Sequence, residues 1–160
     1  MESNPIITRT DFLRAAFGKT CGAVCLGTAS LSILLSSCKS VYYAQMPVLK
    51  GRAIQVSKKE FESVDKKGAV TMRPFILVEM KGQSHPIYLR RKGTGDEYTA
   101  VLMKCSHQGN ELNAHDGYLT CPAHGSEYTA EGKVTEGPAE KDLTTYRVTT
   151  DEGNIYINIG

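Results

Sequence analysis

Two short segments of the chain each place a cysteine and a histidine close together: Cys105-Ser106-His107 and Cys121-Pro122-Ala123-His124. A glycine follows each histidine within two residues, at Gly109 and Gly125, and glycine is typical of tight turns. Thiolate and imidazole groups in one set favour zinc or iron–sulfur chemistry over hard cations. This layout can bring two loop tips together over one site, and we favour that interpretation over unrelated core cysteines and surface histidines.

The sequence around these loops predicts strands rather than helices. Short runs rich in β-branched and aromatic residues recur between turn residues, and no segment beyond the first forty residues has a long helical period. We therefore expect an antiparallel all-β domain. The expected strands are Arg52–Val56, Phe75–Met80, Ile87–Arg90, Glu97–Lys104, Gly117–Thr120, Ser126–Thr129, Leu143–Thr149 and Asn154–Ile159.

The first forty residues differ in character from the rest. The beginning is positive, and Thr20–Cys38 carries no charged residue, a pattern that predicts a signal peptide over residues 1–37. The segment ends in Leu35-Ser36-Ser37-Cys38, which resembles the lipobox of bacterial lipoproteins. The resemblance implies cleavage before Cys38 and a lipid on its thiol. Residues 38–51 are then expected to form a tether.

An uncleaved transmembrane anchor is the alternative for this hydrophobic segment, because about 20 apolar residues span a bilayer. A lipoprotein with two or more acyl chains is held stably at a membrane. With either anchor, we expect an exported, membrane-anchored protein that faces the periplasm or the cell exterior.

Composition excludes two classes of protein. The chain has 160 residues, with 19 Lys and Arg against 17 Asp and Glu, a formal charge of +2. That balance argues against a nucleic-acid partner, since such proteins carry strongly basic surfaces. Five cysteines are an odd number, so a fully paired disulfide framework is excluded as well.

Zinc is one alternative for the two cysteine–histidine pairs. A tetrahedral set of two thiolates and two imidazoles would satisfy Zn²⁺. Zinc modules usually pair cysteine with cysteine and histidine with histidine, whereas here each loop carries one of each. A zinc-binding structural module on the cell surface therefore stays open as a less favoured interpretation.

The pattern Cys-x-His followed by Cys-x-x-His-Gly resembles the Rieske iron–sulfur family. The resemblance covers residues 52–160 and implies a Rieske-type antiparallel β-sandwich with a small cluster-binding subdomain. In this family two cysteines hold one iron of a [2Fe–2S] cluster and two histidines hold the other. It implies that Cys105 and Cys121 bind the inner iron and that His107 and His124 bind the outer one.

Further matches to the family refine the type of centre. Ser126 and Tyr128 stand where high-potential Rieske proteins place a serine and a tyrosine that donate hydrogen bonds to cluster sulfur atoms. Such donors stabilise the reduced cluster and raise its potential. Gly137-Pro138-Ala139, followed by Leu143–Tyr146, resembles the proline loop that covers the cluster.

One feature of the sequence departs from the Rieske subunits of cytochrome bc complexes. Rieske subunits of cytochrome bc complexes carry an extra cysteine in each loop, and these form a disulfide. Here the corresponding positions are Asn110 and Ala123, so that disulfide is excluded. Rieske ferredoxins and the Rieske domains of oxygenases share this feature, and it predicts a cluster that is lost more easily.

The resemblance implies one-electron transfer without an independent catalytic site. We expect a membrane-tethered carrier that works as a quinol-oxidising, cytochrome bc-type respiratory subunit, with quinol, a cytochrome or another redox protein as partner. The alternative is a ferredoxin-like donor to a separate oxidoreductase or oxygenase. The remaining histidines, His85 and His115, are expected to have surface or loop roles rather than to bind a second metal.

Overall fold

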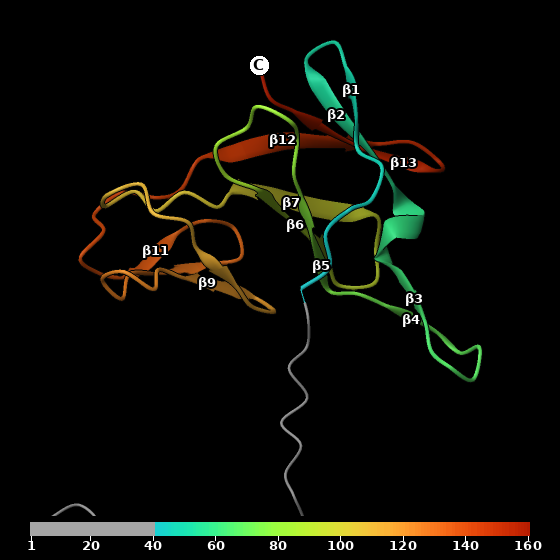
Figure 1. Ribbon diagram of the computed structural model, residues 1–160, viewed down its shortest axis with the longest axis horizontal. Coiled ribbons are helices and arrows are strands. Elements are labelled where there is room, and N and C mark those ends of the chain that lie inside the picture. The colour runs from blue at the N-terminus through green and yellow to red at the C-terminus, as the bar shows by residue number, and fades with distance from the viewer. Residues whose placement is uncertain (1–40) are drawn as a thin grey trace, which may run out of the picture. The chain divides into compact units, whose positions relative to one another are not determined.

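The computed structural model describes residues 41–160, which fold almost entirely into β-strands (Figure 1). The predicted leader, residues 1–37, and the predicted lipidation residue Cys38 lie outside the described residues. Within the described part, no helix is long and apolar enough to cross a membrane. The largest sheet contains β1 (Val48–Lys50), β2 (Ala53–Ser57), β5 (Phe75–Val78), β6 (Ile87–Lys92), β7 (Glu97–Leu102), β12 (Thr145–Thr150) and β13 (Asn154–Asn158).

This seven-stranded sheet has the order β1-β2-β13-β12-β7-β6-β5, and all its ladders are antiparallel. Strand β12 changes partner along its length: Thr145 and Tyr146 pair with β7, and Arg147–Thr150 pair with β13. The two halves of the sheet enclose one apolar core. That core contains Ile54, Val56, Phe61, Ile76, Val78, Ile87, Leu89, Ala100, Ile155 and Ile157.

A second sheet carries the two cysteine–histidine loops. It has four strands in the order β11-β10-β9-β8, and it forms the smaller lobe on the left of Figure 1. The smaller lobe is an insertion between β7 and β12, and the Leu102 N–H donates to the Thr144 carbonyl at its neck. Its strands are β8 (Asn113–Ala114), β9 (Tyr118–Thr120), β10 (Glu127–Thr129) and β11 (Val134–Glu136).

The strands β5, β6 and β7 supply side chains to two cores, because successive residues of a strand point to opposite faces. In β6, Ile87 and Leu89 face the first core, whereas Tyr88 between them faces a second core under the smaller lobe. Burial of both faces explains why these strands are the most continuously apolar in the sequence. The second core also contains Leu77, Val101, Met103, Cys105, Leu112, Leu119, Cys121, Tyr128, Ala130, Ala139 and Leu143.

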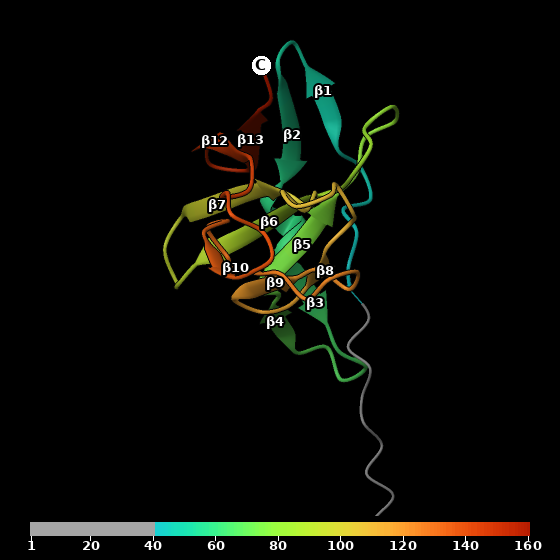
Figure 2. The same cartoon turned by 90° about the vertical axis from the view of Figure 1, so that its left-hand side faces the viewer.

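A two-stranded hairpin projects from the domain on the side away from β1 (Figures 1 and 2). It consists of β3 (Glu62–Val64) and β4 (Val70–Met72) and follows a short 3₁₀ helix, η1 (Lys58–Phe61). Ser57 begins this helix, and its side-chain oxygen accepts from the N–H of Lys59. Phe61 at its end is fully buried in the first core.

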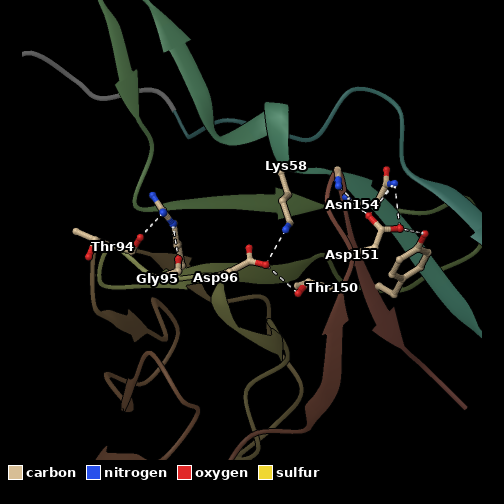
Figure 3. A network of polar contacts seen from close by, with 10 residues as sticks. Lys58, Thr94, Gly95, Asp96, Thr150, Asp151 and Asn154 are labelled. Carbon is tan, nitrogen blue, oxygen red and sulfur yellow. Dashed lines mark hydrogen bonds and ion pairs between the residues drawn. The ribbon is translucent and has the colours of Figure 1, made fainter.

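Asp96 joins the turn between β6 and β7 to the helix η1 and to the end of β12 (Figure 3). It accepts a hydrogen bond from Lys58 at 2.6 Å and another from Thr150 at 3.0 Å. Nearby, Asp151 accepts from the N–H groups of Gly153 and Asn154 in the β12–β13 turn. These exposed carboxylates hold the turns at one end of the strands.

The antiparallel all-β prediction is confirmed, and each of the eight expected strands has an observed counterpart. The strands that the sequence pattern did not predict are short: β1, β3, β4, β8 and β11. The segment predicted as a tether differs from expectation, because residues 41–50 contact the domain. Strand β1 pairs with β2, and the backbone of Tyr42 and Ala44 bonds to Leu77.

Candidate functional site

The two cysteine–histidine loops, residues 105–110 and 121–126, have the same backbone frame. In each loop the cysteine N–H donates to the carbonyl five residues later, and the glycine N–H donates back to the cysteine carbonyl. Because the two loops share this backbone hydrogen-bond pattern, each cysteine has the equivalent position at the start of its turn. The donor–acceptor pairs are Cys105 to Asn110 and Gly109 to Cys105, both 2.8 Å, and Cys121 to Ser126 at 2.8 Å and Gly125 to Cys121 at 3.0 Å.

The glycine that closes each loop has a left-handed backbone conformation. The φ angles are +78° at Gly109 and +80° at Gly125, a region that other residues enter only with strain. A Cβ at Gly109 would also lie 3.1 Å from the Lys104 side chain. Both positions therefore require glycine, as the sequence spacing indicated.

The four predicted ligands divide into an inner and an outer pair. Cys105 and Cys121 are each 2% exposed and belong to the second core. His107 and His124 are exposed, with ring centroids 5.0 Å apart and ring planes nearly perpendicular at 88°. The two cysteines therefore lie in one buried core, and the two histidines lie side by side at the surface.

Tyr128 lies against the first thiol. Its side chain is fully buried, and its hydroxyl oxygen is 3.3 Å from the Cys105 sulfur. Burial raises the pKa of the Cys105 thiol, but hydrogen bonds from Tyr128 and from the His107 backbone outweigh burial and hold that pKa below its ordinary value. Burial, followed by the bond to Cys105, raises the pKa of Tyr128, so this tyrosine stays a protonated donor.

Ser126 lies under the predicted proline loop and is fully buried. Its hydroxyl oxygen accepts a 3.0 Å hydrogen bond from the Ala139 N–H. A serine hydroxyl can accept and donate at the same time, so its hydrogen remains to be donated. The second cluster loop is thereby joined to the segment that covers it.

Ser106 is a site residue that sequence reasoning did not identify. Its hydroxyl donates to the Lys141 carbonyl at 2.6 Å, and its N–H donates to the Tyr128 hydroxyl oxygen at 3.3 Å. Its own hydroxyl oxygen is 3.1 Å from that of Tyr128. Ser106 therefore joins the first loop to residues 137–142, as Ser126 joins the second.

The other two histidines lie outside the ligand set. His85 is half-buried, and its Nε2 is 2.9 Å from the Gly109 carbonyl oxygen, behind the first loop. His115 stacks on Tyr118 and lies 3.0 Å from the Thr120 hydroxyl. Their positions agree with the predicted loop roles, and His85 in addition supports the loop that holds His107.

The donor set fits a binuclear cluster. Two buried sulfur atoms and two exposed nitrogen atoms are the mixed ligation of a Rieske centre. In such a centre the two thiolates hold one iron and the two imidazoles hold the other.

Comparison with known proteins identifies the class. The Rieske [2Fe-2S] domain family matches residues 56–147, so the chain belongs to this family. Its cofactor is a Rieske-type [2Fe–2S] cluster, and this result sets aside the zinc interpretation.

Several characterised Rieske proteins are similar to the chain. The cytochrome b6-f complex iron-sulfur subunit of Chlorobaculum tepidum is 34% identical over 41% of this chain and 37% of that protein. Iron-sulfur subunit 2 of the same complex from Synechocystis sp. is 40% identical over 49% of this chain and 45% of that protein. The chain thus spans less than half the length of these curated relatives. The structure of the plasma membrane Rieske protein PetC3 from Synechocystis PCC 6803 matches 52% of this chain and 85% of that chain, with 31% identity and a TM-score of 0.47.

Proposed function

We propose that the protein is a membrane-anchored Rieske electron carrier and the iron–sulfur subunit of a quinol-oxidising complex. The observation that carries this proposal is the pair of neighbouring exposed imidazoles, His107 and His124, each in a loop that begins with a buried cysteine. When bound, a Rieske-type cluster supplies reversible one-electron transfer. The exposed pair is where an external partner would make contact.

In this proposal Cys105 and Cys121 bind the buried iron and His107 and His124 the outer iron. Each imidazole has two nitrogen atoms, so one stays free while the other binds metal. A free nitrogen at the surface can exchange a proton with a quinol or with water. Electron and proton uptake from one quinol would then occur at the same exposed edge.

Two hydroxyl groups of the chain are placed to favour the reduced state. Tyr128 donates toward the Cys105 sulfur, and Ser126 retains a hydrogen that it can donate toward the cluster. Hydrogen bonds to cluster sulfur atoms stabilise the added negative charge of reduction. We therefore expect a potential in the upper part of the Rieske range, which extends from roughly −150 to +300 mV.

Sequence similarity supports the quinol-oxidising assignment. Both curated relatives described above are named as subunits of the cytochrome b6-f complex. The predicted leader and the lipobox at Cys38 add a membrane anchor on the exported side. Because residues 41–50 pair with the domain, we place the connection to the anchor between Cys38 and Val41.

A ferredoxin-like donor to a separate oxidoreductase or oxygenase is the second candidate. It is favoured by Asn110 and Ala123, which replace the cysteines of the clamping disulfide. A low midpoint potential would favour this alternative.

The test uses the full chain extracted from membranes. We expect the electron paramagnetic resonance signal of a reduced, mixed-ligand [2Fe–2S] cluster, a high midpoint potential, and reduction by an added quinol. A His107→Ala variant should lose the signal, whereas His115→Ala, the matched control, should keep it. A potential near the lower limit together with no reduction by quinol would reject the proposed partner.

A further inference from the structure

The β3–β4 hairpin exposes an apolar face to solvent. Val64 pairs with Val70, and Glu62 with Met72, so these four side chains share one face of the ribbon. Val64 is 65%, Val70 60% and Met72 48% exposed. Near the tip this face is apolar, with Glu62 at the base.

The tip of the hairpin is basic. Asp65 directs one carboxylate oxygen to the N–H groups of Lys67 and Ala69, at 2.7 and 2.9 Å, so its charge is held within the turn. Lys66 and Lys67 are exposed and belong to none of the ion pairs of the described residues. Two cations beside an apolar patch complement an anionic membrane surface.

The base of the hairpin contacts the segment that leads to the predicted anchor. The guanidinium of Arg73, which follows β4, lies 3.9 Å from the ring centre of Tyr42. The Tyr42 hydroxyl donates to Glu60, in the helix before β3, at 2.7 Å. Tyr42 is therefore held at the base of the hairpin.

Chain length then limits how far the hairpin can lie from a membrane. From Cys38 to Tyr42 there are 42 − 38 = 4 residue steps, which span about 14 Å at most when extended. The three-residue strands of the hairpin reach roughly 10 Å from their base. An anchor at Cys38 thus keeps the tip within reach of the bilayer.

We propose that the tip of the β3–β4 hairpin inserts Val64, Val70 and Met72 into the headgroup boundary of a bilayer, with Lys66 and Lys67 on anionic headgroups. This inference rests on the anchor at Cys38 in the proposed function. The hairpin is then a second membrane contact that orients the domain, in addition to the lipid.

The test uses fluorescence, because the chain contains no tryptophan. Val70→Trp introduces a single probe into the apolar face. Val48→Trp is the matched control, since Val48 is a strand valine of similar exposure, 50%, in β1 at the opposite side of the domain. Full-length protein is reconstituted into vesicles of phosphatidylcholine and phosphatidylglycerol, with and without bromine on the acyl chains.

Brominated lipid should quench the Val70→Trp emission about two-fold or more, given an insertion depth of about 5–10 Å, and should leave Val48→Trp nearly unchanged. Adding Lys66→Gln and Lys67→Gln should reduce the quenching in anionic vesicles to the level seen in phosphatidylcholine alone.

Equal quenching of the two variants in vesicle-bound protein would overturn the hairpin contact. An emission shift that grows with protein density but is the same with and without brominated lipid would assign the apolar face to a protein partner. That result would overturn the membrane contact as well. Protein that does not float with the vesicles would overturn the anchor and the contact together. Paramagnetic resonance of the same samples reports on the cluster, so failure of electron transfer is recognised separately.

Discussion

The hydroxyl of Tyr128 lies 3.3 Å from the sulfur of Cys105, in a core that is closed to solvent. Its other neighbours direct the hydroxyl hydrogen. Ser106 donates its N–H to the tyrosine oxygen and its own hydroxyl hydrogen to Lys141. The tyrosine hydrogen is left for the Cys105 sulfur or the Ser106 oxygen, and a metal-bound thiolate would be the stronger acceptor.

Replacing Tyr128 with phenylalanine should lower the midpoint potential, because the reduced cluster loses a hydrogen-bond donor. A loss of about 1 kcal/mol corresponds to about 40 mV for a one-electron couple. Protein-film voltammetry measures the change. Tyr156→Phe is the control, since that hydroxyl bonds to Asp151 in the β12–β13 turn, and equal potentials in the two variants would contradict the role of Tyr128.

Ser126→Ala should destabilise the fold. The change leaves the N–H of Ala139 without its partner in a buried position, and an unpaired buried donor costs about 1–3 kcal/mol. Urea unfolding followed by circular dichroism measures the loss. Ser63→Ala, on the polar face of the hairpin, should change stability little, and similar values for both variants would argue against this role.

Ser106→Ala should increase the rate at which the cluster is lost. The substitution removes the hydroxyl that joins the first loop to Lys141, so the loop opens more often. The decay of visible absorbance at elevated temperature gives the rate. Since Ser106 lies between two predicted ligands, Ser106→Thr provides a check: it keeps the hydroxyl and should restore most of the retention.

A disulfide across the two loops should slow the same process. Asn110→Cys combined with Ala123→Cys would restore the cysteine positions of the clamped relatives. We expect slower cluster loss in the oxidised double variant than in either single variant. An unchanged rate, with the disulfide verified by mass spectrometry, would show that residues 137–142 already hold the loops closed.

Asp151 predicts a pH dependence of stability. The hydrogen bond from Tyr156, together with those from the Gly153 and Asn154 N–H groups, lowers the pKa of Asp151 from 3.8 to about 2. Because the folded-state pKa lies below the unfolded value, this stabilisation is complete above about pH 4 and is lost as the pH falls toward 2. Asp151→Asn should therefore reduce the melting temperature at pH 7, and the difference should shrink below pH 4. Asp116→Asn is the matched exposed control.

The sequence predicted the longer strands and the ligand loops for physical reasons that are local. Strands β5, β6 and β13 are continuous apolar or alternating runs, and the loops carry their own glycines. Strand β1 and the hairpin strands have three residues each, and all their side chains except Ser63 are exposed. Their pairing depends on neighbours that a local pattern does not reveal.

The same distinction applies to the site. Tyr128 and Ser126 were predicted because they follow His124 closely in a known motif. Ser106 was not, because its partner, the Lys141 carbonyl, comes from a segment distant in the sequence. Every residue has a backbone carbonyl, so the residue type at position 141 does not indicate that this carbonyl accepts a hydrogen bond. Only the folded structure identifies the contact.

The neck of the smaller lobe has a consequence for how such a protein can be altered. The lobe leaves the larger sheet after Leu102 and returns at Thr144, and these two residues are hydrogen-bonded neighbours. The two ends of the lobe are therefore fixed side by side, so residues 103–143 form a cassette, a segment that can be exchanged as one unit. Exchanging this cassette for that of another Rieske protein should preserve the strand order of the host sheet. The face that needs redesign contains Leu77, Tyr88 and Val101, which the exchanged lobe must cover.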